Sequence, residues 1–116
     1  GFAGLTITTP EEHDRVIAYT SQLAHIASSA YVKSPQAQRR RGLSAGSFRD
    51  LTRVARLDPD MWAELMAGNA DFLAEQLELL IENLGEYLSA LRDGDSVQLR
   101  QLLRDGCEKK ALAGGH

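Results

Sequence analysis

Disulfide-forming, membrane-spanning and secretory signals are all missing from this sequence. Its 116 residues include a single cysteine, Cys107. One cysteine excludes an internal disulfide and a cysteine-based metal site, and it suits the reducing cytoplasm. Because neither a signal peptide nor an apolar run of about 18 residues occurs, we expect a cytoplasmic protein with no metal site and no membrane contact.

An excess of positive charge is also lacking. The chain carries 13 basic and 16 acidic side chains, which gives a formal net charge of -3. Nonspecific binding to nucleic acid draws most of its affinity from a basic surface, so no nucleic-acid partner is predicted. The one basic cluster, Arg39-Arg40-Arg41, lies in a polar stretch and is interpreted as solvated rather than as a site.

No Gly-x-Gly-x-x-Gly motif is present, and 116 residues are too few for a dinucleotide-binding domain in addition to a second core. Residues 1–8 are short, β-branched and glycine-bearing, and they are interpreted as a linker or, as the family resemblance given below implies, the end of a preceding dinucleotide-binding domain. Residues 9–112 form the predicted domain. Residues 113–116, which end in Gly-Gly-His, are interpreted as a tail.

Helix signals recur along residues 9–112. Thr9-Pro10-Glu11-Glu12 is a capping box with proline at the first helical position, and it predicts a first helix that runs to residue 34, before Pro35. Residues 36–45 are polar and aperiodic, which predicts a loop. Further helices are predicted over residues 47–56, 59–67, 70–91 and 96–112. With no credible sheet, the fold class is all-α, a bundle of about five helices.

The predicted helix over residues 70–91 has a wide apolar stripe. Its members are Phe72, Leu73, Leu77, Leu80, Ile81, Leu84, Tyr87, Leu88 and Leu91. A small bundle covers so wide a stripe poorly, and a second copy of the chain would bury it, so the pattern favours a homodimer. A compact monomeric bundle is the alternative.

The chemistry of the chain centres on the start of the short helix at residues 47–56. Gly46 and Ser47 suit a helix start, where backbone N–H groups remain unpaired, and Arg53 on the same helix offers a fork of donors that fits a carboxylate. Asp14 and Asp50 are candidates to orient that guanidinium. The alternative is that Arg53 only forms an ion pair with one of these acids.

Four more side chains need an interpretation, and two of them, His25 and Trp62, have both a structural and a functional one. His25 is either a boundary residue of the first helix or a ligand contact, and the Gln22 amide both donates and accepts hydrogen bonds. Trp62 is a packing anchor or the wall of a pocket. His13 is interpreted as a group of the first helical turn, like Asp14, which also compensates the helix dipole.

Three motifs, in order along the chain, carry a family resemblance. They are Thr9-Pro10-Glu11-Glu12-His13-Asp14-Arg15, Thr20-Ser21-Gln22-Leu23-Ala24-His25, and Gly46-Ser47-Phe48-Arg49-Asp50-Leu51-Thr52-Arg53 with the following Asp58-Pro59-Asp60-Met61-Trp62. From about residue 6 to about residue 90, the sequence resembles the helical C-terminal domain of the prephenate dehydrogenases.

The resemblance implies specific roles for several residues. Arg53 matches an arginine that contacts a carboxylate of prephenate, and His25 matches the second histidine of a His-Leu-Pro-His run close to the substrate. Gln22 stands in place of the first histidine of that run, and Ala24 in place of its proline. The predicted substrate-binding residues are Arg53, His25, Gly46, Ser47 and Gln22, supported by Asp14, Asp50 and Trp62, and no catalytic residue is predicted.

The resemblance also implies an intertwined dimer and a reaction. Hydride leaves the ring carbon that bears the hydroxyl, a base removes the hydroxyl proton, and loss of carbon dioxide drives aromatisation to 4-hydroxyphenylpyruvate, in tyrosine biosynthesis. In the family the NAD-binding loop and the principal catalytic histidine lie in an N-terminal domain. This chain is therefore expected to hold part of the site, to lack NAD binding and to be inactive alone.

Two other functions remain open from the sequence. A chorismate-mutase-like helical isomerase would also be small and dimeric, but it needs several cations facing the bundle interior, and only Arg53 has a clear cluster here. A noncatalytic helical interaction module is favoured by the wide apolar stripes and disfavoured by the cluster around Arg53.

Overall fold

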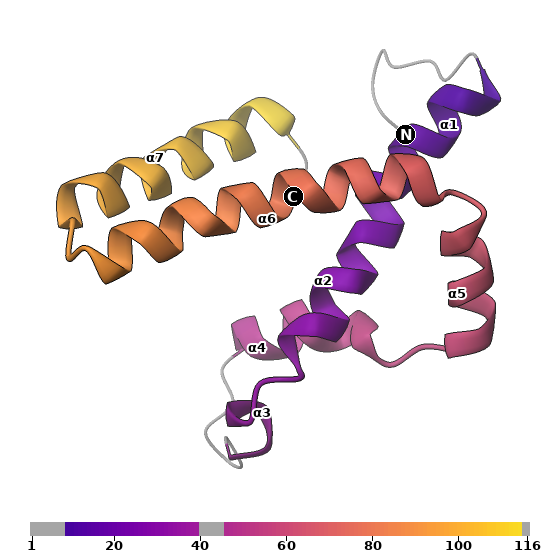
Figure 1. Cartoon of the computed structure of the whole chain (residues 1–116), viewed down its shortest axis with the longest axis horizontal. Helices are drawn as coiled ribbons and strands as arrows, with labels where there is room; N and C mark the ends of the chain where they lie inside the picture. Colours follow the sequence, from indigo (N-terminus) through magenta and orange to yellow (C-terminus); the bar gives the residue numbers. More distant parts are fainter. Residues whose placement is uncertain (1–8, 40–45, 115–116) are drawn as a thin grey trace. The chain divides into compact units, whose positions relative to one another are not determined.

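The computed structural model describes residues 9–39 and 46–114. Within these ranges all regular structure is helical, which confirms the all-α prediction and its five main helices (Figure 1). The chain divides into two compact units, with the boundary between Leu77 and Glu78. The predicted linker, residues 40–45 of the predicted loop and the last two residues of the predicted tail lie outside the described residues.

The first helix consists of three consecutive segments, α1 (Pro10–Ile17), η1 (Ala18–Leu23) and α2 (Ala24–Tyr31). The Thr9 hydroxyl accepts a hydrogen bond from the backbone N–H of Glu12 at 3.0 Å, as the capping box predicts. The middle segment is π-helical, so each of its turns holds more residues than an α-helical turn. The helix ends at Tyr31, three residues before the predicted end.

The prediction of a loop from residue 36 is wrong at its start, because α3 (Gln36–Arg39) forms one helical turn there. The Ser34 hydroxyl accepts from the backbone N–H of Gln36 at 3.3 Å, and the Ser34 carbonyl accepts from Ala37 at 2.9 Å. Ser34-Pro35 thus repeats the cap-then-proline pattern that starts α1.

The predicted helix at residues 47–56 is divided into α4 (Gly46–Thr52) and the 3₁₀ segment η2 (Arg53–Ala55), and both pack against α2 (Figure 1). The Thr52 hydroxyl donates back to the Phe48 carbonyl at 2.7 Å, at the end of the α-helical part. Arg53 is therefore in a tighter 3₁₀ turn rather than on the predicted regular helix.

Helix α5 (Pro59–Ala67) begins at the predicted cap. The Asp58 carboxylate accepts from the backbone N–H groups of Asp60 and Met61 at 3.1 and 3.4 Å. After Asn69, helix α6 (Ala70–Arg92) begins, and its first residues still belong to the first unit. Among the described residues of this unit, the buried apolar side chains are Ala18, Leu23 and Leu73.

The second unit is a helical hairpin made of residues 78–92 of α6 and of α7 (Ser96–Ala113), which runs back along it (Figure 1). Asp95 caps α7 by accepting from the backbone N–H of Gln98 at 2.9 Å, and Tyr87 donates from its hydroxyl to the Leu102 carbonyl at 3.2 Å. Large apolar side chains remain exposed on this unit: Leu79, Ile81, Leu84, Leu88, Leu91, Val97, Leu103 and Leu112. Among the described residues, no helix has the length and apolarity needed to cross a membrane.

Candidate functional site

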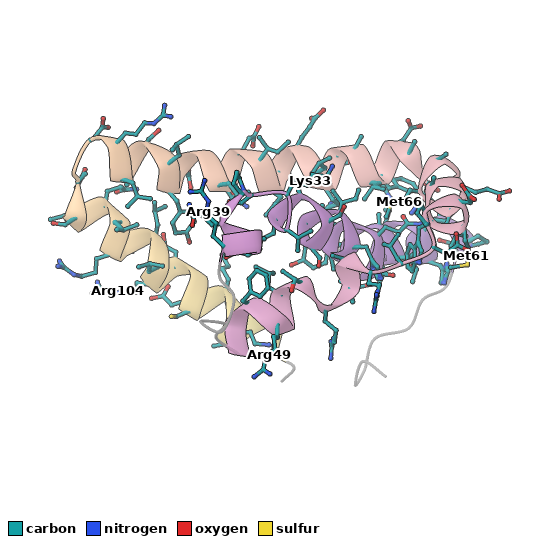
Figure 2. All side chains as sticks on the ribbon, turned by 90° about the horizontal axis from the view of Figure 1, so that it is seen from below. Lys33, Arg39, Arg49, Met61, Met66 and Arg104 are labelled. Atoms are coloured by element: carbon teal, nitrogen blue, oxygen red, sulfur yellow. The ribbon has the colours of Figure 1, made fainter. Side chains whose placement is uncertain are left out.

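A cleft of about 260 Å³ lies in the first unit, lined by residues of α2 and α5. The imidazole of His25 stacks on the indole of Trp62, with 3.9 Å between the ring centroids and 23° between the planes. The other lining residues are Ile26, Ser29, Ala30, Lys33, Leu57, Pro59, Ala63 and Met66. Figure 2 shows Met66 on the side of α5 towards the first helix and Met61 on its outer side. The cleft is thus mostly apolar with a few polar groups, as small-molecule sites usually are.

The orientation of the His25 ring is fixed by its own helix. Its Nδ1 atom lies 2.7 Å from the carbonyl oxygen of Ser21, one turn earlier. A carbonyl oxygen only accepts hydrogen bonds, so Nδ1 carries the proton and donates it. In the neutral ring, Nε2 is then the acceptor nitrogen, and in the protonated ring it becomes a second donor.

Gln22 is buried, with only 5% of its surface exposed. Its Nε2 atom donates to the Leu65 carbonyl at 3.3 Å, and its Oε1 atom accepts from Asn69 Nδ2 at 2.9 Å. Both ends of the amide are therefore engaged inside the fold. Gln22 thus lies in the π-helical turn among buried residues and does not line the cleft, and its direct contact with substrate stays a prediction.

Arg53 is exposed on η2 and does not line the cleft. Among residues 9–39 and 46–114, no ion pair joins Arg53 to Asp14 or Asp50, so the predicted orienting pairs are absent. Asp14 instead lies 3.5 Å from His13 Nδ1, with both side chains exposed in the first helix. The Arg53 guanidinium is thus available to an external anion.

Gly46 begins α4, and a Cβ atom added to it would meet nothing within 4 Å. The fold itself therefore does not require glycine at this position. Ser47 lies in the first turn of α4, and its side chain is outside the described part of the structure. Asp50 is exposed on the same helix, and Figure 2 shows Arg49 extending away from it.

The structure thus brings His25 and Trp62 together and buries Gln22 outside the cleft. Of the other predicted residues, Gly46, Asp50 and Arg53 lie on the α4–η2 segment, which packs against α2. The sequence reasoning missed Ser29 and Lys33 as cleft residues. A signal for them was present, because they follow His25 at spacings of four and eight residues. On the predicted helix to residue 34 this spacing places all three on one face, whereas in the structure Lys33 lies in the turn just after the end of α2 at Tyr31.

The family comparison covers all of these residues. The model of the family described as "Prephenate dehydrogenase, dimerization domain" matches residues 9–105. The chain belongs to this family. The match includes every predicted site residue and both helices of the second unit up to residue 105.

Curated relatives agree with this assignment. Cyclohexadienyl dehydrogenase from Zymomonas mobilis is 37% identical over 100 residues, which are 78% of this chain and 34% of that protein. Prephenate dehydrogenase from Lactococcus lactis is 29% identical over 109 residues, which are 90% of this chain and 31% of that protein. The chain thus spans about a third of the length of these relatives.

Among solved structures, the crystal structure of Synechocystis arogenate dehydrogenase is similar, with a TM-score of 0.82. The sequence identity is 20%, and the match covers 94% of this chain and 42% of that chain. At this identity the likeness concerns the fold alone, and it agrees with the family assignment.

Proposed function

We propose that this chain is the C-terminal dimerisation and substrate-binding domain of an NAD-dependent prephenate dehydrogenase. The complete enzyme would convert prephenate to 4-hydroxyphenylpyruvate with loss of carbon dioxide, in tyrosine biosynthesis and in the cytoplasm. The observation that carries the proposal is the family match over residues 9–105. The names of the curated relatives support the reaction class.

The cleft beside Trp62 is the proposed part of the prephenate site in this chain. Its apolar walls suit a carbocyclic ring, and Lys33 supplies a cation at its edge. His25 offers its Nε2 edge to a polar group of the substrate. Arg53 is proposed to bind a carboxylate, with Gly46 and Ser47 supplying backbone N–H groups at the start of α4.

NAD is proposed to bind to a part of the enzyme outside this chain. The residues present do not fit a dinucleotide, because the sequence has no Gly-x-Gly-x-x-Gly motif and the described residues have no strand for a βαβ unit. The partner within the assembly is proposed to be a second copy of the chain, which would cover the exposed apolar side chains of the second unit.

An assay of the complete protein that carries this chain tests the proposal. With prephenate and NAD, we expect NADH absorbance to rise in step with 4-hydroxyphenylpyruvate measured by chromatography. Arogenate and chorismate serve as parallel substrates. A folded protein that reduces NAD with neither prephenate nor arogenate would contradict the proposal, and consumption of chorismate without NAD would favour the isomerase instead.

A further inference from the structure

A short network of hydrogen bonds ties the end of α5 to the first helix. The Leu65 carbonyl lies in the last turn of α5, where carbonyls lack a partner within the helix. Its α-helical partner would be the backbone N–H of Asn69, but that N–H donates to the Met66 carbonyl at 3.1 Å instead. Gln22 Nε2 donates to this Leu65 carbonyl at 3.3 Å. Asn69 Nδ2 donates to Gln22 Oε1 at 2.9 Å and to the Asp14 carbonyl at 2.8 Å.

This network lies next to the aromatic stack. Gln22 precedes His25 by three residues on the first helix, and Leu65 follows Trp62 by three residues on α5. The Gln22–Leu65 bond and the His25–Trp62 stack are therefore contacts on successive turns of the same two helices, which run antiparallel at this point. A hydrogen bond at one turn sets the register of the ring contact at the next.

Asn69 and the Leu65 carbonyl together fix which way the Gln22 amide points. Its NH₂ group has two hydrogens, and they go to two different acceptors, Gln22 Oε1 and the Asp14 carbonyl. With Oε1 held towards Asn69, the Gln22 NH₂ group must face Leu65. Without the Asn69 donor, Gln22 Oε1 loses its hydrogen-bond partner, and the 3.3 Å bond to the Leu65 carbonyl alone is left to hold the amide in place.

We propose that Asn69 is a positioning residue for the substrate cleft. Through the orientation of Gln22 and the carbonyl of Leu65, it holds α5 in the register in which Trp62 stacks on His25. Gln22 shares this positioning role, because it bonds directly to the Leu65 carbonyl on α5. In this proposal it supports the cleft and does not contact the substrate. This inference rests on the proposed function, because it assumes that prephenate uses the cleft.

The test uses Asn69→Asp and Asn69→Ala in the complete enzyme, with Asn83→Asp as the matched control. Aspartate, like asparagine, suits the position before a helix, but it has no NH₂ group to donate. The control residue, Asn83, is exposed on α6. We expect the KM for prephenate to rise at least about fivefold in both Asn69 variants and the KM for NAD to stay within about twofold. The control should change neither.

Two further readouts separate positioning from simple stabilisation. The emission spectrum is measured on the 116-residue chain, where Trp62 is the only tryptophan, so that it reports on the stack, and we expect a red shift in the Asn69 variants as the indole becomes more hydrated. If Asn69 acts through Gln22, the double variant with Gln22→Leu should be no worse in prephenate KM than Gln22→Leu alone.

The outcomes distinguish this inference from the function on which it rests. Unchanged emission in both Asn69 variants would overturn the positioning role, as would additive effects with Gln22→Leu or a parallel rise of both KM values with lower thermal stability. Altered emission with an unchanged KM for prephenate would support the positioning of Trp62 by Asn69 and overturn the cleft as the substrate site.

Discussion

The imidazole of His25 lies on the indole of Trp62 with their centroids 3.9 Å apart. The Nδ1 atom of the same imidazole is bound to the Ser21 carbonyl at 2.7 Å, so the ring is held both on its face and at one edge. Only the Nε2 edge remains for a ligand. The two rings therefore act as one preorganised surface, in which a change to the indole alters how the imidazole is presented.

The first prediction concerns this stack. Replacing Trp62 by Leu removes an aromatic contact worth about 0.5–1.5 kcal/mol, so the KM for prephenate in the complete enzyme should rise about 2- to 13-fold. Phe at the same position should recover part of the loss. Steady-state kinetics measure the effect, and Met61→Leu, on the outer side of α5, is the control. An unchanged KM in Trp62→Leu would show that the cleft does not bind the substrate.

Local signals predicted most of the fold. The caps at Thr9 and Asp58 accept the backbone bonds that their sequence patterns imply, because a cap depends on three or four consecutive residues. The one wrong loop prediction, at Gln36–Arg39, overlooked the same pattern at Ser34-Pro35.

The site was less predictable because its geometry depends on contacts between distant residues. No proline or glycine marks the π-helical turn Ala18–Leu23, which places Gln22 in the core. The links from Gln22 to Leu65 and Asn69 span more than 40 positions and have no local sequence signature. The sequence therefore predicted which residue types carry the chemistry. It did not predict which of them line the cleft and which form the hydrogen-bond network beside it.

The second prediction is that the chain is a homodimer in solution. Leu84 and Leu88 are one turn apart on α6 and are 57% and 49% exposed, and burial of such side chains favours pairing with a second copy. Light scattering coupled to size exclusion should give twice the mass of the chain. The Leu84→Glu/Leu88→Glu variant should be monomeric, whereas Asn83→Glu should remain dimeric. A wild-type monomer at tens of micromolar would refute the prediction.

The third prediction is that the chain alone does not bind NAD. No residue pattern in it supplies the backbone cradle that a dinucleotide pyrophosphate needs. Calorimetric titration of the folded chain with NAD should therefore release no heat beyond dilution, and the chain should not turn over prephenate. Micromolar binding would mean that the cofactor uses a surface of the helical domain.

The fourth prediction concerns the stability of the first unit. Ser28 is fully buried, and its hydroxyl has no hydrogen-bond partner within the described part of the chain. An unsatisfied buried hydroxyl is costly, so Ser28→Ala should raise the free energy of unfolding by about 1 kcal/mol. Urea unfolding measures this, with Ser29→Ala at the edge of the cleft as the control. A loss of stability in Ser28→Ala would show that the hydroxyl has a partner in solution.

The last prediction concerns Arg53, for which the sequence leaves two interpretations. If it binds a substrate carboxylate, Arg53→Ala removes a charge-assisted hydrogen bond worth about 1.5–3 kcal/mol and should weaken prephenate recognition about 10- to 150-fold. The KM for NAD should hardly change. Lysine should restore only part of the loss, because a point charge lacks the two-pronged geometry of the guanidinium.

The structural alternative for Arg53 required an ion pair with Asp14 or Asp50, and the described residues form neither pair. Because the side chain is exposed, its removal should change the free energy of unfolding by no more than about 0.5 kcal/mol. Arg49→Ala, an exposed arginine on α4, is the matched control and should leave both KM values unaltered. Thermal unfolding and both KM values are measured on the same preparations. An Arg53→Ala enzyme that is destabilised but binds prephenate normally would exclude the carboxylate contact, since only the structural role predicts that combination.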